Sequence, residues 1–215
     1  MGTLSANRLG AIALIIGPIL GLVFWFLTPG YGFVDQARPG DAQAIIVALM
    51  TNGTWAHVCG FLTLLGILLF GYGLLNVNSS IQSGGNGDAF SKFGTYLVVV
   101  AITLFAVSNS MLHVLASNAQ TAAGAVYAVS NGIDGIGGII FGLAILCTNL
   151  AMSARDDFNK LLSYAGVLTA LVLIVAVILG GLSDGAEAAM ELVEGICFLI
   201  ITVWAVAIGA SRLKA

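Results

Sequence analysis

The stretch LSYAGVLTALVLIVAVILGGL, residues 162–182, decides the fold class of this chain. It contains no charged side chain, and its length matches the roughly 20 apolar residues that an α-helix needs to cross a bilayer. Five further stretches meet the same requirement. The sequence therefore predicts an all-α, polytopic membrane protein, a compact bundle of six transmembrane helices at approximately 9–28, 54–75, 94–115, 133–152, 162–182 and 186–208.

Two other stretches are apolar without being spans of their own. Residues 42–50 are too short to cross the hydrocarbon, so we expect them to lie at the membrane interface or to pack on the bundle. Residues 120–130 are expected to extend the fourth helix outward. Two glycine pairs with small-x-x-x-small spacing, Gly17 with Gly21 and Gly138 with Gly142, predict close contacts between helices.

The composition supports a single transmembrane domain over residues 1–215. The chain is 59% hydrophobic and only 8% charged, whereas soluble domains carry about 25% charged residues. No hydrophilic block is long enough for a separate soluble domain. The low charge, with a net value of −3, also excludes nucleic-acid binding. Three cysteines, Cys59, Cys147 and Cys197, fall inside apolar runs and do not indicate a disulfide framework.

The basic residues predict the orientation, because cytoplasmic loops of membrane proteins carry an excess of lysine and arginine. A cytoplasmic N-terminus leaves only Arg38 outside and places six basic residues inside, namely Arg8, Lys92, Arg155, Lys160, Arg212 and Lys214. We therefore expect both termini to be cytoplasmic, in a lipid bilayer that we take to be a prokaryotic inner (plasma) membrane.

The start of the last span, GAEAAMELVEGICFLI at residues 185–200, carries unexpected carboxylates. Asp184 and Glu187 are explained by helix capping, as an N-cap residue and the acid three positions later. Glu191 and Glu194 lie too far along the helix for capping. An ionised carboxylate within a span costs about 2.5 kcal/mol or more, so these two side chains must be paired, hydrated or protonated.

Both histidines of the chain are expected at the level of these glutamates. His57 begins the second span and His113 ends the third, so the topology places both in the outer leaflet. Asp134 begins the fourth span on the same side. The four helices that carry these side chains can therefore bring them together.

Three kinds of site fit this set of residues. His57, His113, Glu191 and Glu194 have the donor types that bind a divalent metal, and the two histidines alone could instead be axial ligands of a b-type haem. The same groups also suit a hydrated pathway for protons or cations. In each case Asp134, Asn109 and Ser110 are expected as supporting or entrance groups. A plainer alternative is that each histidine pairs with a nearby carboxylate at the interface.

The sequence leaves a second class of function open. The chain contains no zinc-protease, phosphate-loop, dinucleotide or serine-nucleophile motif, so no enzymatic activity is assigned. The leading hypothesis is a small membrane protein with an outward-facing polar site. Its rival is a non-catalytic accessory subunit that packs against the other subunits of a larger membrane complex and pairs its carboxylates with them.

Overall fold

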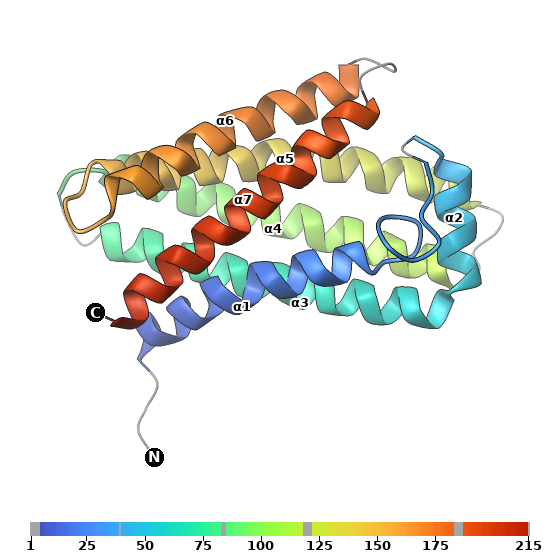
Figure 1. Ribbon diagram of the computed structural model, residues 1–215, viewed down its shortest axis with the longest axis horizontal. Helices are drawn as coiled ribbons and strands as arrows, with labels where there is room; N and C mark the ends of the chain where they lie inside the picture. The colour runs from blue at the N-terminus through green and yellow to red at the C-terminus, as the bar shows by residue number, and fades with distance from the viewer. Residues whose placement is uncertain (1–4, 39, 83–84, 118–121, 183–186, 215) are drawn as a thin grey trace.

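A computed structural model describes residues 5–38, 40–82, 85–117, 122–182 and 187–214. These ranges contain seven helices and no strand (Figure 1). Six helices are long and apolar enough to cross a membrane, as the sequence predicted. The seven are α1 (Ala6–Phe26), α2 (Ala42–Thr51), α3 (Gly53–Ile81), α4 (Asp88–Ala116), α5 (Ala123–Ser153), α6 (Lys160–Leu182) and α7 (Glu187–Lys214).

The six long helices form a closed ring in chain order. Each packs against its neighbours in the sequence, with α1 beside α3, and α7 closes the ring by packing against α1. One end of the bundle holds the first residues of α1 and the last residues of α7; we call it the terminal end (Figure 1). The other end carries α2 and is called the α2 end. Successive long helices run in opposite directions between the two ends, as successive spans of a membrane protein must.

Helix α2 is the short segment expected at 42–50, and it packs on the bundle. Asp41 caps its N-terminus, because a carboxylate oxygen of Asp41 accepts a hydrogen bond from the backbone N–H of Ala44 at 3.0 Å. Its apolar face is buried in a cluster with α3, α4 and α5, formed by Ile45, Ile46, Leu49, Ala56, Leu115, Ala116 and Ala123. This cluster holds α2 against the ends of those three helices.

Glycine allows a close contact between α1 and α3. A Cβ atom at Gly66 would lie 2.6 Å from the Cα atom of Gly21, and one at Gly17 would lie 2.8 Å from the Cα atom of Phe70. On the other side of the ring, a Cβ atom at Gly142 would lie 2.6 Å from Ile174 of α6. Both predicted glycine pairs therefore lie in helix–helix contacts.

Four phenylalanines fill the middle of the bundle. The ring of Phe141 on α5 contacts Phe70 of α3, Phe105 of α4 and Phe198 of α7, with centroid separations of 5.8, 5.9 and 6.0 Å. We call these four side chains the phenylalanine layer. Because they come from four helices of the ring, they form an apolar barrier between the polar side chains of the two ends.

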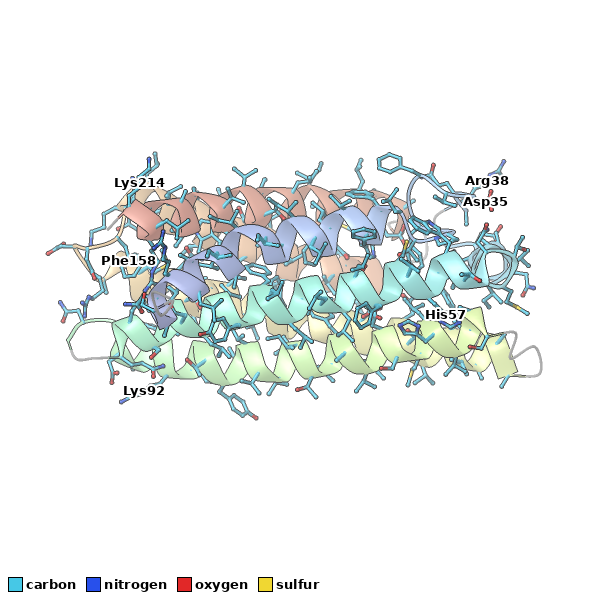
Figure 2. The ribbon with its side chains drawn as sticks, turned by 90° about the horizontal axis from the view of Figure 1, so that it is seen from below. Asp35, Arg38, His57, Lys92, Phe158 and Lys214 are labelled. Atoms are coloured by element: carbon cyan, nitrogen blue, oxygen red, sulfur yellow. The ribbon has the colours of Figure 1, made fainter. Side chains whose placement is uncertain are left out.

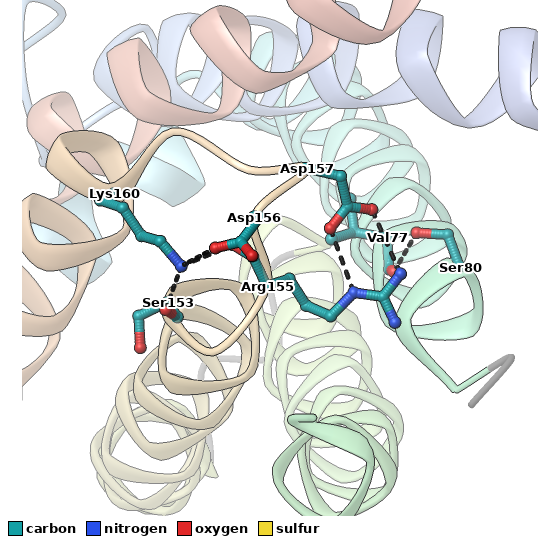
Figure 3. Close-up of polar contacts among 7 residues, drawn as sticks. All are labelled: Val77, Ser80, Ser153, Arg155, Asp156, Asp157 and Lys160. Atoms are coloured by element: carbon teal, nitrogen blue, oxygen red, sulfur yellow. Dashed lines mark hydrogen bonds and ion pairs between the residues drawn. The ribbon is translucent and has the colours of Figure 1, made fainter. Parts of the chain in front are cut away.

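Polar contacts at the terminal end connect helices and stabilise the α5–α6 connection. Inside the bundle, the Asn78 amide donates a hydrogen bond to Thr148 at 3.1 Å. In the connection, the Lys160 ammonium lies 3.3 Å from Asp156 and Arg155 lies 3.1 Å from Asp157 (Figure 3). The hydrogen bond from Arg155 holds the pKa of the Asp157 carboxyl below its usual value.

Candidate functional site

The structure places the two histidines in direct contact at the α2 end. His57 is in the first turns of α3 and His113 in the last turns of α4, and these helices are antiparallel neighbours. The Nδ1 atoms of the two imidazoles are 2.8 Å apart. Figure 2 shows His57 near the α2 end, remote from Lys92 and Lys214 at the terminal end. Both side chains are half-buried.

The two rings meet edge to edge. Their planes differ by only 10° and their centroids are 5.1 Å apart. The distance between the centroids equals the 2.8 Å between the Nδ1 atoms plus about one ring radius for each imidazole. That sum is reached only when both centroids and both Nδ1 atoms lie on one line. The imidazoles therefore lie in line in almost one plane, rather than face to face. An N–H···N hydrogen bond in this geometry is close to linear, as strong hydrogen bonds prefer.

Ser117 favours one arrangement of the protons in the neutral pair. Its hydroxyl donates to the backbone carbonyl of His113 at 2.8 Å, and its oxygen lies 3.4 Å from Nε2 of His57. If that oxygen accepts from Nε2, His57 carries its proton there and accepts at Nδ1. His113 then donates from Nδ1, and its Nε2 atom is an acceptor that no hydrogen bond among the described residues uses.

Asn109 and Gly60 lie beside that free acceptor. A Cβ atom at Gly60 would lie 3.1 Å from Nε2 of His113 and 3.4 Å from Oδ1 of Asn109. The Asn109 side chain is only 7% exposed, and its Oδ1 atom has no hydrogen-bond partner among the described residues. Ser110, the other expected supporting residue on α4, is exposed and donates to the carbonyl of Ala106 at 2.7 Å in its own helix.

The carboxylates gather elsewhere, around a tyrosine that the sequence did not single out for the site. Burial of the Tyr31 hydroxyl, with the nearby charges of Tyr127, Asp134 and Glu191, raises the pKa of Tyr31 well above its ordinary value. The Asp134 carboxyl also has Ser108 as a hydrogen-bonding neighbour, and Glu194 interacts with Glu191. Tyr31 belongs to the connection between α1 and α2, so this group is assembled from a loop and two helices.

The order of the helices in the ring explains this separation. Helix α7, which carries Glu191 and Glu194, packs between α6 and α1, whereas the histidines lie on α3 and α4. The expected cap residue Asp184 lies outside the described residues, as does the side chain of Glu187. The capping interpretation of this pair stays a prediction.

The contact between the two histidines can be compared with what a metal ion or a haem would require. Within the described residues, no three His, Cys, Asp or Glu side chains form a group that could hold a metal ion. The two Nδ1 atoms point at each other, so a metal ion bound by both would lie between them. With bonds of about 2 Å the two atoms would then be about 4 Å apart, whereas they are 2.8 Å apart. Edge-to-edge contact also leaves no room for a porphyrin between the rings, so the pair does not fit a haem. The four-residue metal site and the accessory-subunit role stay predictions.

Of the residues that the sequence predicted for the site, the structure brings together His57, His113 and Asn109. Ser117 and Gly60, which complete their surroundings, carry no signal in a single sequence beyond being small. The function is therefore inferred from the geometry of these residues. No protein-family model matches the chain, and the comparisons with curated proteins and with solved structures found no similar protein.

Proposed function

We propose that this integral membrane protein binds and relays protons at its His57–His113 pair, on the outer side of the membrane. The observation that carries the proposal is the in-line contact of the two Nδ1 atoms at 2.8 Å. Imidazole is the side chain whose charge ordinarily changes between about pH 5 and pH 8. A hydrogen bond between two imidazoles is a direct path for a proton from one ring to the other.

The pair can hold one extra proton but not two. With one extra proton, Nδ1 of His113 can still donate to Nδ1 of His57. With two, both Nδ1 atoms carry hydrogen and face each other as donors, so the contact must open. The protonation state of the pair therefore controls a contact between α3 and α4. This links the pH of the outer solution to the packing of two neighbouring helices.

The relay is confined to one half of the membrane. Phe70, Phe105, Phe141 and Phe198 lie between the α2 end and the polar contacts of the terminal end. An apolar layer offers no acceptor to a moving proton. We therefore expect uptake and release on the outer side, without a proton current across the membrane.

The orientation in this proposal follows from the basic residues. Arg38 lies at the α2 end, while Lys92 and Lys214 lie at the terminal end (Figure 2). We infer that the α2 end faces outward and that both termini are cytoplasmic, in a plasma membrane. The three native cysteines are buried. A membrane-impermeant thiol reagent applied to intact cells should thus label R38C and leave K92C unlabelled; the reverse pattern would overturn the orientation.

The test of the histidine pair uses protein labelled with ¹⁵N-histidine in detergent micelles. The chain has only two histidines, so H57Q and H113Q assign every imidazole signal. We expect a scalar coupling between the two Nδ1 atoms, transmitted through the hydrogen bond. Each substitution should abolish this coupling, because it removes one of the two Nδ1 atoms.

The control is T103A, since Thr103 is an exposed residue of the same helix as His113 and donates to the carbonyl of Val99 in that helix at 2.9 Å. It should leave the coupling unchanged. Vesicles loaded with a pH indicator complete the test, because they should show no histidine-dependent proton current. Absence of the Nδ1–Nδ1 coupling would refute the proposal. A histidine-dependent current would refute its restriction to one side.

A further inference from the structure

We propose that Asn109 is a positioning residue of the histidine pair, whose amide oxygen accepts a hydrogen bond from Nε2 of His113 when the pair carries its extra proton. Asn109 thus determines which of the four ring nitrogens holds that proton. The inference rests on the proposed function, because it names the atom at which the pair is loaded. It involves the side chains of Asn109 and His113 and the contact of both with Gly60.

The first observation is that the amide oxygen of Asn109 is buried without a partner. The side chain is only 7% exposed, and Oδ1 receives no hydrogen bond from the described residues. Buried acceptors in folded proteins are almost always hydrogen-bonded, either to protein or to ordered water. This exception therefore needs a donor that another state of the protein supplies.

The close packing around Oδ1 means that a neighbouring side chain must be this donor. A Cβ atom at Gly60 would lie 3.4 Å from Oδ1 of Asn109, 3.1 Å from Nε2 of His113 and 3.3 Å from Cε1 of the same ring. Contacts below 3.4 Å are tighter than almost all real contacts of a Cβ atom, so the backbone of α3 closes this side of the ring and leaves no room for water.

The second observation is the position of Nε2. Asn109 and His113 are four residues apart on α4, so their side chains lie on one face of the helix, one turn apart. In the proton arrangement that Ser117 favours, Nε2 of His113 is an acceptor. Two acceptors cannot bond to each other, which agrees with the unpartnered Oδ1. One added proton converts Nε2 into a donor beside a buried acceptor.

Loading of the pair then forms one hydrogen bond and breaks none. A proton from the outer solution attaches to the lone pair of Nε2 of His113, a side chain that is only half-buried. After a small rotation of the Asn109 side chain, the new N–H donates to Oδ1. Nδ1 of His113 keeps its own proton and its 2.8 Å contact with His57. A hydrogen bond to the charged form favours that form. Discharge reverses these steps and returns the proton to the outer solution.

Ionisable side chains on the neighbouring helices do not take the place of the amide. From α3, the charge that acts on His113 is that of His57. Helix α2 carries no ionisable side chain. At this end of α5 the ionisable side chains are Tyr127 and Asp134, and both act on Tyr31. A neutral amide binds a charged donor less strongly than a carboxylate does, so the proton at Nε2 remains exchangeable.

The experiment measures how fast the Nε2 proton of His113 exchanges with water, in the full-length, ¹⁵N-histidine-labelled protein in micelles. The pH is set so that the pair carries one extra proton. In wild type the Nε2–H signal should be sharp and slow to exchange. N109L removes the acceptor at nearly the same side-chain volume and should speed the exchange by about tenfold or more. The Nδ1–Nδ1 coupling of the neutral pair should persist in N109L.

Two further variants keep the test decisive. N109D retains an acceptor oxygen at the same place and should keep the exchange slow, whereas N109A lacks the acceptor and repeats the test if N109L does not fold. T103A is the control on the same helix and should leave the exchange unchanged, because Thr103 is exposed and bonds within α4.

Equal exchange rates in wild type and in a variant without the acceptor would overturn the inference, as would a neutral His113 protonated at Nε2. If the Nδ1–Nδ1 coupling is present but the Nε2 proton exchanges rapidly in wild type, the role of Asn109 fails and the proposed function stands. Absence of the coupling in wild type removes the proposed function itself.

Discussion

Replacement of Gly66 by alanine should strongly destabilise the bundle, because the added methyl group on α3 meets the backbone of α1. The new Cβ atom would lie 2.6 Å from the Cα atom of Gly21 and 2.8 Å from the carbonyl oxygen of Gly17. The backbone nitrogen of Gly21 would lie closer still to the new Cβ atom. Ordinary contacts of a Cβ atom begin at 3.4 Å, so the two helices must separate by about 1 Å. Overpacking of this kind costs about 1–3 kcal/mol. The unfolded fraction should therefore rise by about fivefold to about 150-fold.

The assay is reversible unfolding in mixed micelles of mild and denaturing detergent, followed by circular dichroism. G66A is compared with wild type and with G135A, which lies on α5 and where a Cβ atom would meet nothing within 4 Å. G135A should be neutral or slightly stabilising, since alanine favours helix over glycine by up to about 1 kcal/mol. A G66A protein as stable as G135A would show that α1 and α3 do not approach each other as closely as described.

Three further predictions concern the two ends of the bundle. Because burial raises the pKa of Tyr31, its phenol should remain protonated above about pH 10, where a free tyrosine ionises. Its contribution to stability is fully present below about pH 10 and is lost as pH rises through the folded-state pKa. A spectroscopic titration of wild type and Y31F checks this, because the variant should lack the phenol that ionises well above the ordinary value. Because the pKa of Asp157 is lowered, the carboxylate contributes to the stability of the fold above about pH 4. This contribution to stability is lost as pH falls through the folded-state pKa. D157N should nevertheless cost less than about 1 kcal/mol near pH 7 in detergent unfolding, because the pair with Arg155 is exposed. N78L should destabilise the protein by about 1–3 kcal/mol in the same assay, since it leaves buried Thr148 without its amide donor.

The level of the histidines could be predicted from the sequence, but their contact could not. Antiparallel spans determine depth, because His57 lies near the start of one helix and His113 near the end of the next, so both lie at the same end of the bundle. Depth says nothing of which helices are neighbours. The sequence grouped Glu191 and Glu194 with the histidines because all four lie at a similar depth. In the structure, α7, which carries the two glutamates, packs against α6 and α1, whereas the histidines lie on α3 and α4. Helix order and rotation are decided by side-chain packing around the whole ring.

The helix ends show a similar limit. The second span was expected at 54–75, yet α3 continues to Ile81, and the fourth was expected at 133–152, yet α5 begins at Ala123. Hydropathy marks only the part of a helix that lies in hydrocarbon. Backbone hydrogen bonds continue beyond it into the interface. The extension of the fourth helix over residues 120–130 was expected, and the structure confirms it from Ala123 onward.

Closure of the ring by α7 has a consequence for biosynthesis. Helices α3 to α6 can each pack on the preceding long helix as they leave the ribosome, but α1 receives its second neighbour only when α7 has been made. The backbone of Gly209 comes so close to α1 that a Cβ atom there would lie 2.7 Å from the carbonyl oxygen of Ala11. Chains that stop before α7 leave this face of α1 open to lipid. Deletion of α7 should therefore produce an inserted but incomplete bundle, recognisable to the membrane proteases that remove unassembled proteins.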